Sequence, residues 1–220
     1  MDERTTHTGQ LLVFDLDGTL YCTASSFVPT MRAVYDEYGV PYPSDRAILG
    51  QVGEPFSTFL DWLITQGFPD RYEEIAKRIG ELELDSIAER GRLFPDVDET
   101  LRRLRDDGYV IALCTNGDRT YAELVLSSCG ILELFDALQT NEVDGSTKAE
   151  LLRELLAEHP NERAFMIGDR YHDMEAGRAN GCTVIGATYG YGGAEMSVAD
   201  RVIDSFSALP AVLDDLVVLG

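Results

Sequence analysis

The 220-residue sequence contains only two lysines, three histidines, four cysteines and one tryptophan. It also lacks any run of the roughly 18 consecutive apolar residues that a membrane span needs. Its first ten residues are polar and do not contain the apolar centre of a secretory signal peptide. We therefore expect neither a membrane-spanning segment nor an exported chain.

Positive charge is scarce as well. Lys and Arg number 18 against 39 Asp and Glu, which gives a formal net charge of −21. A chain this acidic is a poor candidate for holding a nucleic-acid backbone or an anionic membrane by charge. We therefore expect no nucleic-acid partner and no membrane partner.

The four cysteines are not arranged as a metal site or a disulfide framework. Cys22, Cys114, Cys129 and Cys182 form no C-x-x-C pair, and no histidine follows them at metal-ligand spacing. We predict reduced, mostly buried thiols, which together with the missing export signal indicates a cytoplasmic protein.

The apolar pattern changes its period along the chain. Residues 11–14 read as a buried strand, and the segment 27–88 has helical spacing throughout. From residue 95 onward, helices alternate with strands that we expect at 109–114, 135–138, 164–167, 183–187 and 201–203. This order predicts an α/β fold with a doubly wound parallel sheet. We assign residues 1–20 and 95–220 to this core and residues 21–94 to an inserted all-helical domain.

Polar side chains follow the expected strands at the edge where ligands bind in open parallel sheets. They come after residues 11–14, after residues 109–114, after residues 164–167 and at the start of the helix 148–158: Asp15, Asp17, Thr19, Thr115, Asn116, Asp118, Asp169, Asp173 and Lys148. Any one of them alone would be an ordinary turn or cap residue. Their joint placement predicts one polar site.

The acids of this site require a cation. Clustered carboxylates repel one another, and carboxylate oxygens are ligands that Mg²⁺ prefers. With Asp17 protonated, the charges of Asp15, Asp169 and Asp173 are balanced by Lys148 and one Mg²⁺, so the site can accept an anionic phosphate. Lys148 is one of only two lysines, and a compact ammonium suits a position beside a phosphoryl group.

Four motifs in this order resemble those of the haloacid dehalogenase superfamily of phosphohydrolases. They are residues 15–20 (DLDGTL), Thr115-Asn116, Lys148 and residues 168–173 (GDRYHD). A helical insertion after the first motif is similar to the capped branch, which includes phosphoglycolate phosphatases, β-phosphoglucomutases and some 5′-nucleotidases. The segment 181–193 is similar to the phosphatase and nucleotidase side of that branch.

The resemblance implies a role for each motif residue. Asp15 would be the nucleophile that forms an aspartyl-phosphate, and Asp17 would protonate the leaving alkoxide and later activate water. Thr115 would hydrogen-bond the transferring phosphoryl group, helped by Lys148. Mg²⁺ would be bound by the carboxylates of Asp15 and Asp169, by the backbone carbonyl of Asp17, and by Asp173 directly or through a water.

The helical insertion, which we call the cap, would close over this site and contact the substrate. The segment 49–54 lies between two expected cap helices, and we single out Gln51 there, with Glu54 and Arg46 beside it. Tyr21 and Asn116 each adjoin a motif residue and are expected to bind substrate. Arg170 and His172 are expected only to orient Asp169 or to face solvent.

These residues predict a Mg²⁺-dependent phosphatase acting on a small phosphorylated metabolite. One alternative is a sugar-phosphate mutase of the β-phosphoglucomutase type, although such mutases usually carry Val where this chain has Thr19, with His and Arg in the cap. Another alternative is a non-catalytic binding protein on the same fold, which predicts a broken motif where none is broken. Phosphoglycolate, a nucleoside monophosphate and a sugar phosphate are all compatible substrates, and the sequence does not determine the oligomeric state.

Overall fold

A single parallel sheet forms the centre of the larger lobe. The computed structural model describes residues 9–142 and 145–218. Six strands pair in the order β3-β2-β1-β4-β5-β6, and every pair is parallel. They are β1 (Gln10–Phe14), β2 (Val110–Cys114), β3 (Ala137–Gln139), β4 (Arg163–Gly168), β5 (Thr183–Ala187) and β6 (Arg201–Ile203).

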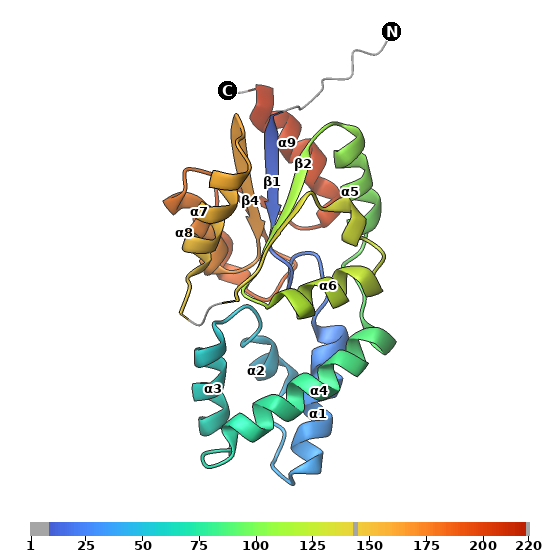
Figure 1. Cartoon of the computed structure of the whole chain (residues 1–220), viewed down its shortest axis with the longest axis vertical. Helices are drawn as coiled ribbons and strands as arrows, with labels where there is room; N and C mark the ends of the chain where they lie inside the picture. The colour runs from blue at the N-terminus through green and yellow to red at the C-terminus, as the bar shows by residue number, and fades with distance from the viewer. Residues whose placement is uncertain (1–8, 143–144, 219–220) are drawn as a thin grey trace.

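Helices cover both faces of the sheet (Figure 1). Leu11 and Val13 of β1 pack among residues of α7 and α8 on one face, whereas Leu12 and Phe14 pack among residues of α5, α6 and α9 on the other. Successive strand side chains point to opposite faces, so a strand buried on both sides is apolar throughout. The predicted doubly wound α/β fold is confirmed. The covering helices are α5 (Val97–Asp106), α6 (Arg119–Ser128), α7 (Lys148–Glu158), α8 (Tyr171–Ala179) and α9 (Leu209–Val218).

Four helices make a second lobe beyond one edge of the sheet (Figure 1). It has its own apolar cluster, which includes Met31, Ile48, Leu63 and Ile75. These helices are α1 (Ala24–Glu37), α2 (Asp45–Leu49), α3 (Phe56–Thr65) and α4 (Tyr72–Arg90). The helical lobe corresponds to the insertion expected from the sequence, and the limits 21 and 94 stay our prediction for the cap.

The two chain segments that join the lobes run side by side. The backbone N–H of Cys22 donates to the carbonyl of Arg92 over 2.9 Å, and the N–H of Phe94 donates to the carbonyl of Leu20 over 2.9 Å. A cap carried on two paired segments keeps a defined position over the carboxyl edge of the sheet, where β1 ends.

Two expected elements begin two residues away from their expected starts. The strand expected at 135–138 is β3 (Ala137–Gln139), because the 3₁₀ turn Leu132–Leu134 and the residues that close it occupy the chain just before it. Residues 173–180, whose sequence pattern also predicts a helix, lie mostly in α8 (Tyr171–Ala179). It begins two residues earlier because the Asp173 carboxylate accepts the backbone N–H of Arg170 over 2.9 Å, as the third residue of a helix does.

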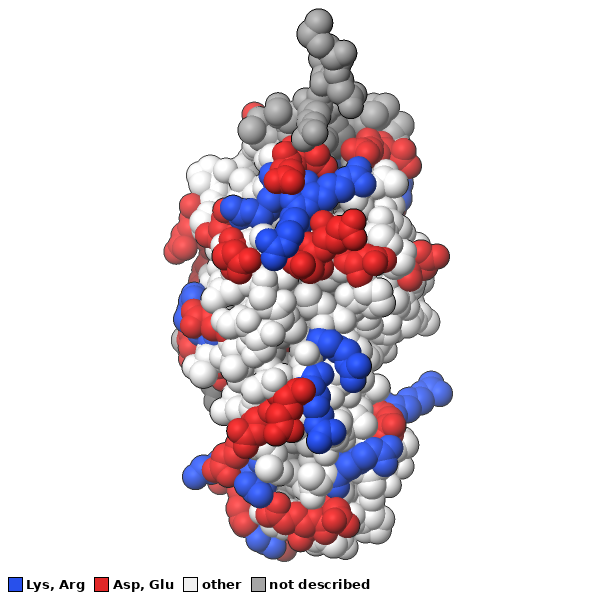
Figure 2. Space-filling view, turned by 90° about the vertical axis from the view of Figure 1, so that its right-hand side faces the viewer, with Lys and Arg blue, Asp and Glu red and all other residues white. Residues whose placement is uncertain are grey.

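Charged side chains of both signs interleave on the face shown in Figure 2, and a largely uncharged band separates the upper charged group from the lower lobe. Among the residues that the structure describes, no helix is both long and apolar enough to cross a membrane.

Candidate active site at the carboxyl edge of the sheet

Lys148 and two carboxylates form the centre of the site. Asp15 follows β1 directly, and its backbone N–H continues the sheet by donating to the carbonyl of Ile167 over 2.9 Å. Its carboxylate is 4% exposed and contacts the Lys148 ammonium, which also lies 2.5 Å from an oxygen of Asp173. Lys148 is the first residue of α7, which Thr147 caps, so the sheet edge and a helix start bring these charges together.

Asp169, which follows β4, completes a group of three buried carboxylates. One oxygen each from Asp15, Asp169 and Asp173 lie within 4.8 Å of one another. The backbone N–H of Tyr191 donates to Asp169 over 2.5 Å, and the Thr19 hydroxyl lies 3.3 Å from Asp15. Three carboxylate oxygens that face one another this closely are a donor set that suits Mg²⁺.

The electrostatics show that this group lacks positive charge. Burial raises the pKa of Asp15 in spite of the attraction of Lys148. Burial, with repulsion from Asp173, raises the pKa of Asp169 to about 7. Burial alone would lower the pKa of Lys148, but Asp15 and Asp173 raise it overall, so this amine stays charged. One ammonium against three carboxylates leaves a deficit that a divalent cation would balance, and the residues therefore fit Mg²⁺.

Two glycines leave room for Asp169. A Cβ on Gly18, whose φ is +87°, would lie 2.5 Å from the carboxylate of Asp169, and a Cβ on Gly190 would lie 2.3 Å from the Cβ of Asp169. Distances this short require displacement of Asp169 or of the backbone. Gly18 belongs to the first sequence motif, whereas Gly190 comes from the segment after β5 that crosses over the site.

Thr115 and Asn116 follow β2 and face different partners. The Thr115 hydroxyl oxygen accepts the backbone N–H of Gly117 over 3.1 Å, which leaves its own proton to donate into the pocket. The Asn116 amide donates to the carbonyl of Gly53 over 2.9 Å. Asn116 therefore connects the core to the cap segment, in addition to lining the pocket where we expected it to bind substrate.

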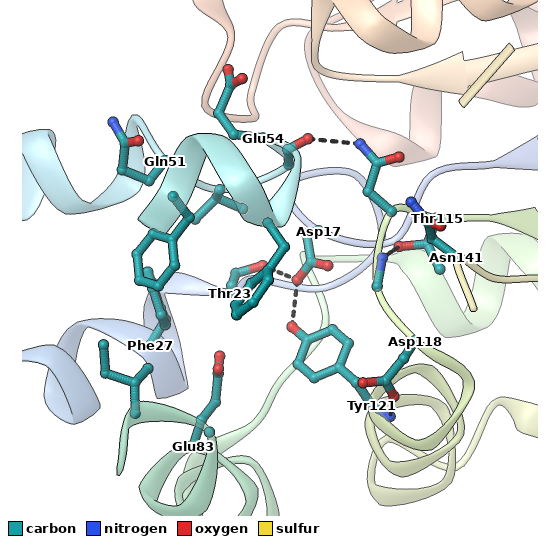
Figure 3. Close-up of a pocket in the computed structure, with 18 of the residues that line it drawn as sticks. Asp17, Thr23, Phe27, Gln51, Glu54, Glu83, Thr115, Asp118, Tyr121 and Asn141 are labelled. Carbon is teal, nitrogen blue, oxygen red and sulfur yellow. Dashed lines mark hydrogen bonds between the residues drawn. The ribbon is translucent and has the colours of Figure 1, made fainter. Parts of the chain in front are cut away.

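Asp17 is held by two hydroxyl groups that the sequence analysis did not single out. The Tyr121 hydroxyl donates to its Oδ1 over 2.6 Å, and the Thr23 hydroxyl donates to the same oxygen over 2.8 Å (Figure 3). Burial raises the pKa of Asp17, and these two hydrogen bonds oppose that shift. Both bonds go to Oδ1, so Oδ2 is left for a ligand. Tyr121 lies within an ordinary amphipathic helix, so no motif could have indicated its role.

A pocket of about 560 Å³ lies between the lobes, over Asp15. The core contributes Asp17, Thr115 and Tyr121, and the cap contributes Gln51 and a largely apolar wall (Figure 3). The remaining lining residues are Thr23, Phe27, Val52, Gly53, Glu54, Phe56, Phe59, Ala76, Ile79, Gly80, Glu83, Leu84, Asn116, Gly117, Asp118, Thr120 and Asn141. Of the cap residues singled out from the sequence, Gln51 and Glu54 line the pocket, whereas Arg46 lies exposed on α2.

The expectation that Tyr21 binds substrate is not supported by the structure. Its ring is completely buried, and its hydroxyl donates to the hydroxyl of Ser26 over 2.7 Å. The backbone of Tyr21 forms isolated bridges with Asp17 and Leu93, and its side chain belongs to the core cluster and not to the described lining of the pocket.

Arg170 does not face solvent, contrary to one of the two expectations for it. The residue is 6% exposed, and its guanidinium contacts the carbonyl of Val52 and lies 2.5 Å from the carboxylate of Glu54. It also donates to Glu195 over 3.2 Å, while His172 lies 3.3 Å from Glu54. Arg170 therefore anchors the cap segment to the core, which the sequence could not indicate because the two positions are more than a hundred residues apart.

The close approach at Gly190 predicts a loss of stability on substitution. Gly190→Ala should lower the free energy of unfolding by about 1–3 kcal/mol, because the added methyl group displaces buried groups. Gly80→Ala is the control, since nothing lies within 4 Å of a Cβ there and alanine is favoured over glycine within a helix. Urea denaturation of the two variants measures the difference, and equal midpoints would contradict the prediction.

Known proteins are similar to this chain in sequence and in fold. Residues 12–187 match the family model described as haloacid dehalogenase-like hydrolase. Phosphoglycolate phosphatase of Haemophilus influenzae is 29% identical over 224 residues, covering 93% of this chain and 98% of that protein. Tyrosine-protein kinase PtkA of Mycobacterium tuberculosis is 30% identical over 217 residues, covering 94% of this chain and 71% of that protein.

A solved structure extends the similarity to the fold. A haloacid dehalogenase-like family hydrolase from Streptococcus pneumoniae superposes with a TM-score of 0.84 at 25% identity, covering 94% of this chain and 99% of that chain. The matched residues run from within β1 through the helices α1–α4 to the end of β5. The chain therefore belongs to the haloacid dehalogenase-like hydrolases, and within them it is a phosphatase that resembles phosphoglycolate phosphatases.

Proposed function

We propose that the protein is a Mg²⁺-dependent phosphatase that hydrolyses a small phosphate monoester through an aspartyl-phosphate on Asp15. The observation that carries this proposal is the convergence of Asp15, Lys148 and two further carboxylates below a pocket that Asp17 and Thr115 also line. Such a site supplies a nucleophile and a proton donor that line the pocket, with the ammonium of Lys148 in contact with the nucleophile.

In the first step, a carboxylate oxygen of Asp15 bonds to phosphorus while the bond from phosphorus to the leaving oxygen breaks. The Oδ2 of Asp17 gives its proton to that oxygen, because Oδ1 is already held by Thr23 and Tyr121. Lys148 and the Thr115 hydroxyl bind the phosphoryl oxygens during the transfer.

In the second step, Asp17 accepts a proton from a water whose oxygen attacks phosphorus. The bond between phosphorus and Asp15 breaks, which restores the carboxylate and releases inorganic phosphate. Asp15, Asp169, Asp173 and the Asp17 carbonyl would hold Mg²⁺, which supplies electrostatic stabilisation of the negative charge on the phosphoryl oxygens when bound.

The mutase alternative predicts a cap that binds a sugar phosphate at both ends. No Arg, Lys or His of the cap is among the described residues that line the pocket, which favours hydrolysis instead. Conversion of a glucose 1-phosphate isomer to the 6-phosphate without phosphate release would establish the mutase. A screen of phosphorylated metabolites with Mg²⁺, including phosphoglycolate and nucleoside monophosphates, tests the phosphatase.

Replacement of the nucleophile should abolish turnover. Asp15→Asn is expected to reduce hydrolysis of p-nitrophenyl phosphate by at least about 10³-fold, since an amide oxygen is a far weaker nucleophile than a carboxylate. Asp85→Asn, an exposed acid on α4, is the control and should retain wild-type turnover. Full activity of Asp15→Asn would contradict a covalent step at this residue.

Removal of the metal should abolish turnover, because the three carboxylates of Asp15, Asp169 and Asp173 would hold it. EDTA should abolish turnover, and added Mg²⁺ should restore it and raise the melting temperature, because a ligand of the native state stabilises it by about 2.7 kcal/mol at 100 times its Kd. Asp169→Asn should lose the Mg²⁺-dependent rise in differential scanning calorimetry. Turnover that persists in EDTA would argue against the metal.

The proton donor should matter most for poor leaving groups. Asp17→Asn is expected to reduce hydrolysis of an alkyl phosphate severely and that of p-nitrophenyl phosphate less, because p-nitrophenolate needs little protonation. Tyr121→Phe removes one hydrogen bond to Asp17 and should cause a smaller loss, about 10-fold, with the same preference.

The control is Tyr42→Phe, which removes the hydrogen bond between a half-buried tyrosine and Asp45 in the cap, away from the pocket. Steady-state kinetics with the two substrates measure the ratio for each variant. Equal losses with both leaving groups would show that Asp17 is not the proton donor.

A further inference from the structure

The residues that line the pocket above Asp15 restrict the kind of leaving group that the pocket can accept. If Asp15 attacks phosphorus, as proposed above, the rest of the ester must lie against the cap. The cap wall is built from Phe27 of α1, Phe59 of α3 and a stretch of α4. Together with the exposed ring of Phe56 and the side chain of Leu84 at the edge, it forms an apolar surface. A cavity of about 560 Å³ holds far more than a two-carbon acid.

Positive charge is missing from this wall. None of the described residues that line the pocket is a lysine, an arginine or a histidine. The nearby cations are already engaged: Lys148 contacts Asp15 and Asp173, and Arg170 contacts Glu54 and Glu195. A carboxylate on the leaving group would therefore lose its water without gaining a cationic partner, which is unfavourable.

The cap places an acid in this wall instead. Glu83 of α4 points into the pocket between Phe27 and Tyr121 (Figure 3). Within residues 9–142 and 145–218 its carboxyl makes no hydrogen bond or ion pair. Burial raises the pKa of Glu83 to about 8, with a contribution from Asp17. Protonated or ionised, this group offers a hydrogen-bond acceptor that no protein donor uses.

We propose that the pocket selects a phosphate monoester whose leaving group has an apolar or aromatic body and a hydroxyl or amine directed at Glu83. The same surface rejects leaving groups that carry a carboxylate, phosphoglycolate among them. The proposal rests on the proposed phosphatase reaction, and it assigns Glu83 to substrate selection and not to the chemical steps.

A matched series of esters tests the preference for a hydroxyl or an amine and the rejection of a carboxylate on the leaving group. The esters are benzyl phosphate, 4-(hydroxymethyl)benzyl phosphate, 4-(aminomethyl)benzyl phosphate and 4-carboxybenzyl phosphate, which differ only at the end that would face Glu83. For the wild-type enzyme with Mg²⁺ we expect kcat/KM to be at least about 10-fold higher for the hydroxymethyl or aminomethyl ester than for the carboxy ester. Equal values for all four esters would overturn the proposal.

Charge reversal tests the residue itself. Glu83→Lys should reverse the preference between the aminomethyl and carboxy esters, and Glu83→Gln should reduce it. Asp85→Lys makes the same change at an exposed position of α4 and should leave the preference unchanged. A preference that Glu83→Lys does not alter, or that Asp85→Lys alters equally, would contradict the role of Glu83.

The outcome is distinguishable from failure of the proposed function. Benzyl phosphate carries no second group, so its hydrolysis tests the phosphatase reaction alone. If none of the esters is hydrolysed, calorimetric binding of the same series to the wild-type protein and to Glu83→Lys still measures the preference. Tighter binding of the carboxy ester than of the aminomethyl ester to the wild-type protein would overturn the proposal.

Discussion

The buried contact of Lys148 with Asp15 and Asp173 is the interaction on which the rest of the structure depends. Three carboxylates that meet below a pocket repel one another, and a single ammonium keeps two of them in place. The contact joins the end of β1 to the starts of α7 and α8, so it also fixes how these elements meet. In a chain with two lysines, one is used here.

The cap is tied to this centre by polar contacts that cross between the lobes. Asn116 holds the carbonyl of Gly53, and Arg170 holds Val52 and Glu54. Asp17 accepts hydrogen bonds from the hydroxyl of Thr23, at the start of the cap, and from the hydroxyl of Tyr121, in the core. Because one oxygen of Asp17 is held from both lobes, the position of the cap and the orientation of the Asp17 carboxyl group depend on each other.

The acidic residues outside the site and those inside it have different consequences for binding. Most of the 39 acidic residues lie outside the site, where they interleave with arginines on the face shown in Figure 2. Inside the site, the acids near the sheet edge suit a cation, whereas Glu83 lies in an apolar wall where none of the described lining residues is a Lys, Arg or His. The net charge of −21 is thus compatible with an anionic substrate.

The sequence by itself determined the α/β core and the residues that follow its strands. Parallel strands buried on both faces must be apolar, and their carboxyl ends must share an edge of the sheet. The sequence alone therefore predicts that Asp15, Thr115 and Asp169 lie close together. Tertiary structure alone decided the rest. Tyr121 and Arg170 make contacts between segments far apart in the chain, Glu83 is brought to the pocket by the cap, and Tyr21 packs in the core. Neither periodicity nor spacing encodes which helix faces which loop, because packing between the lobes sets it.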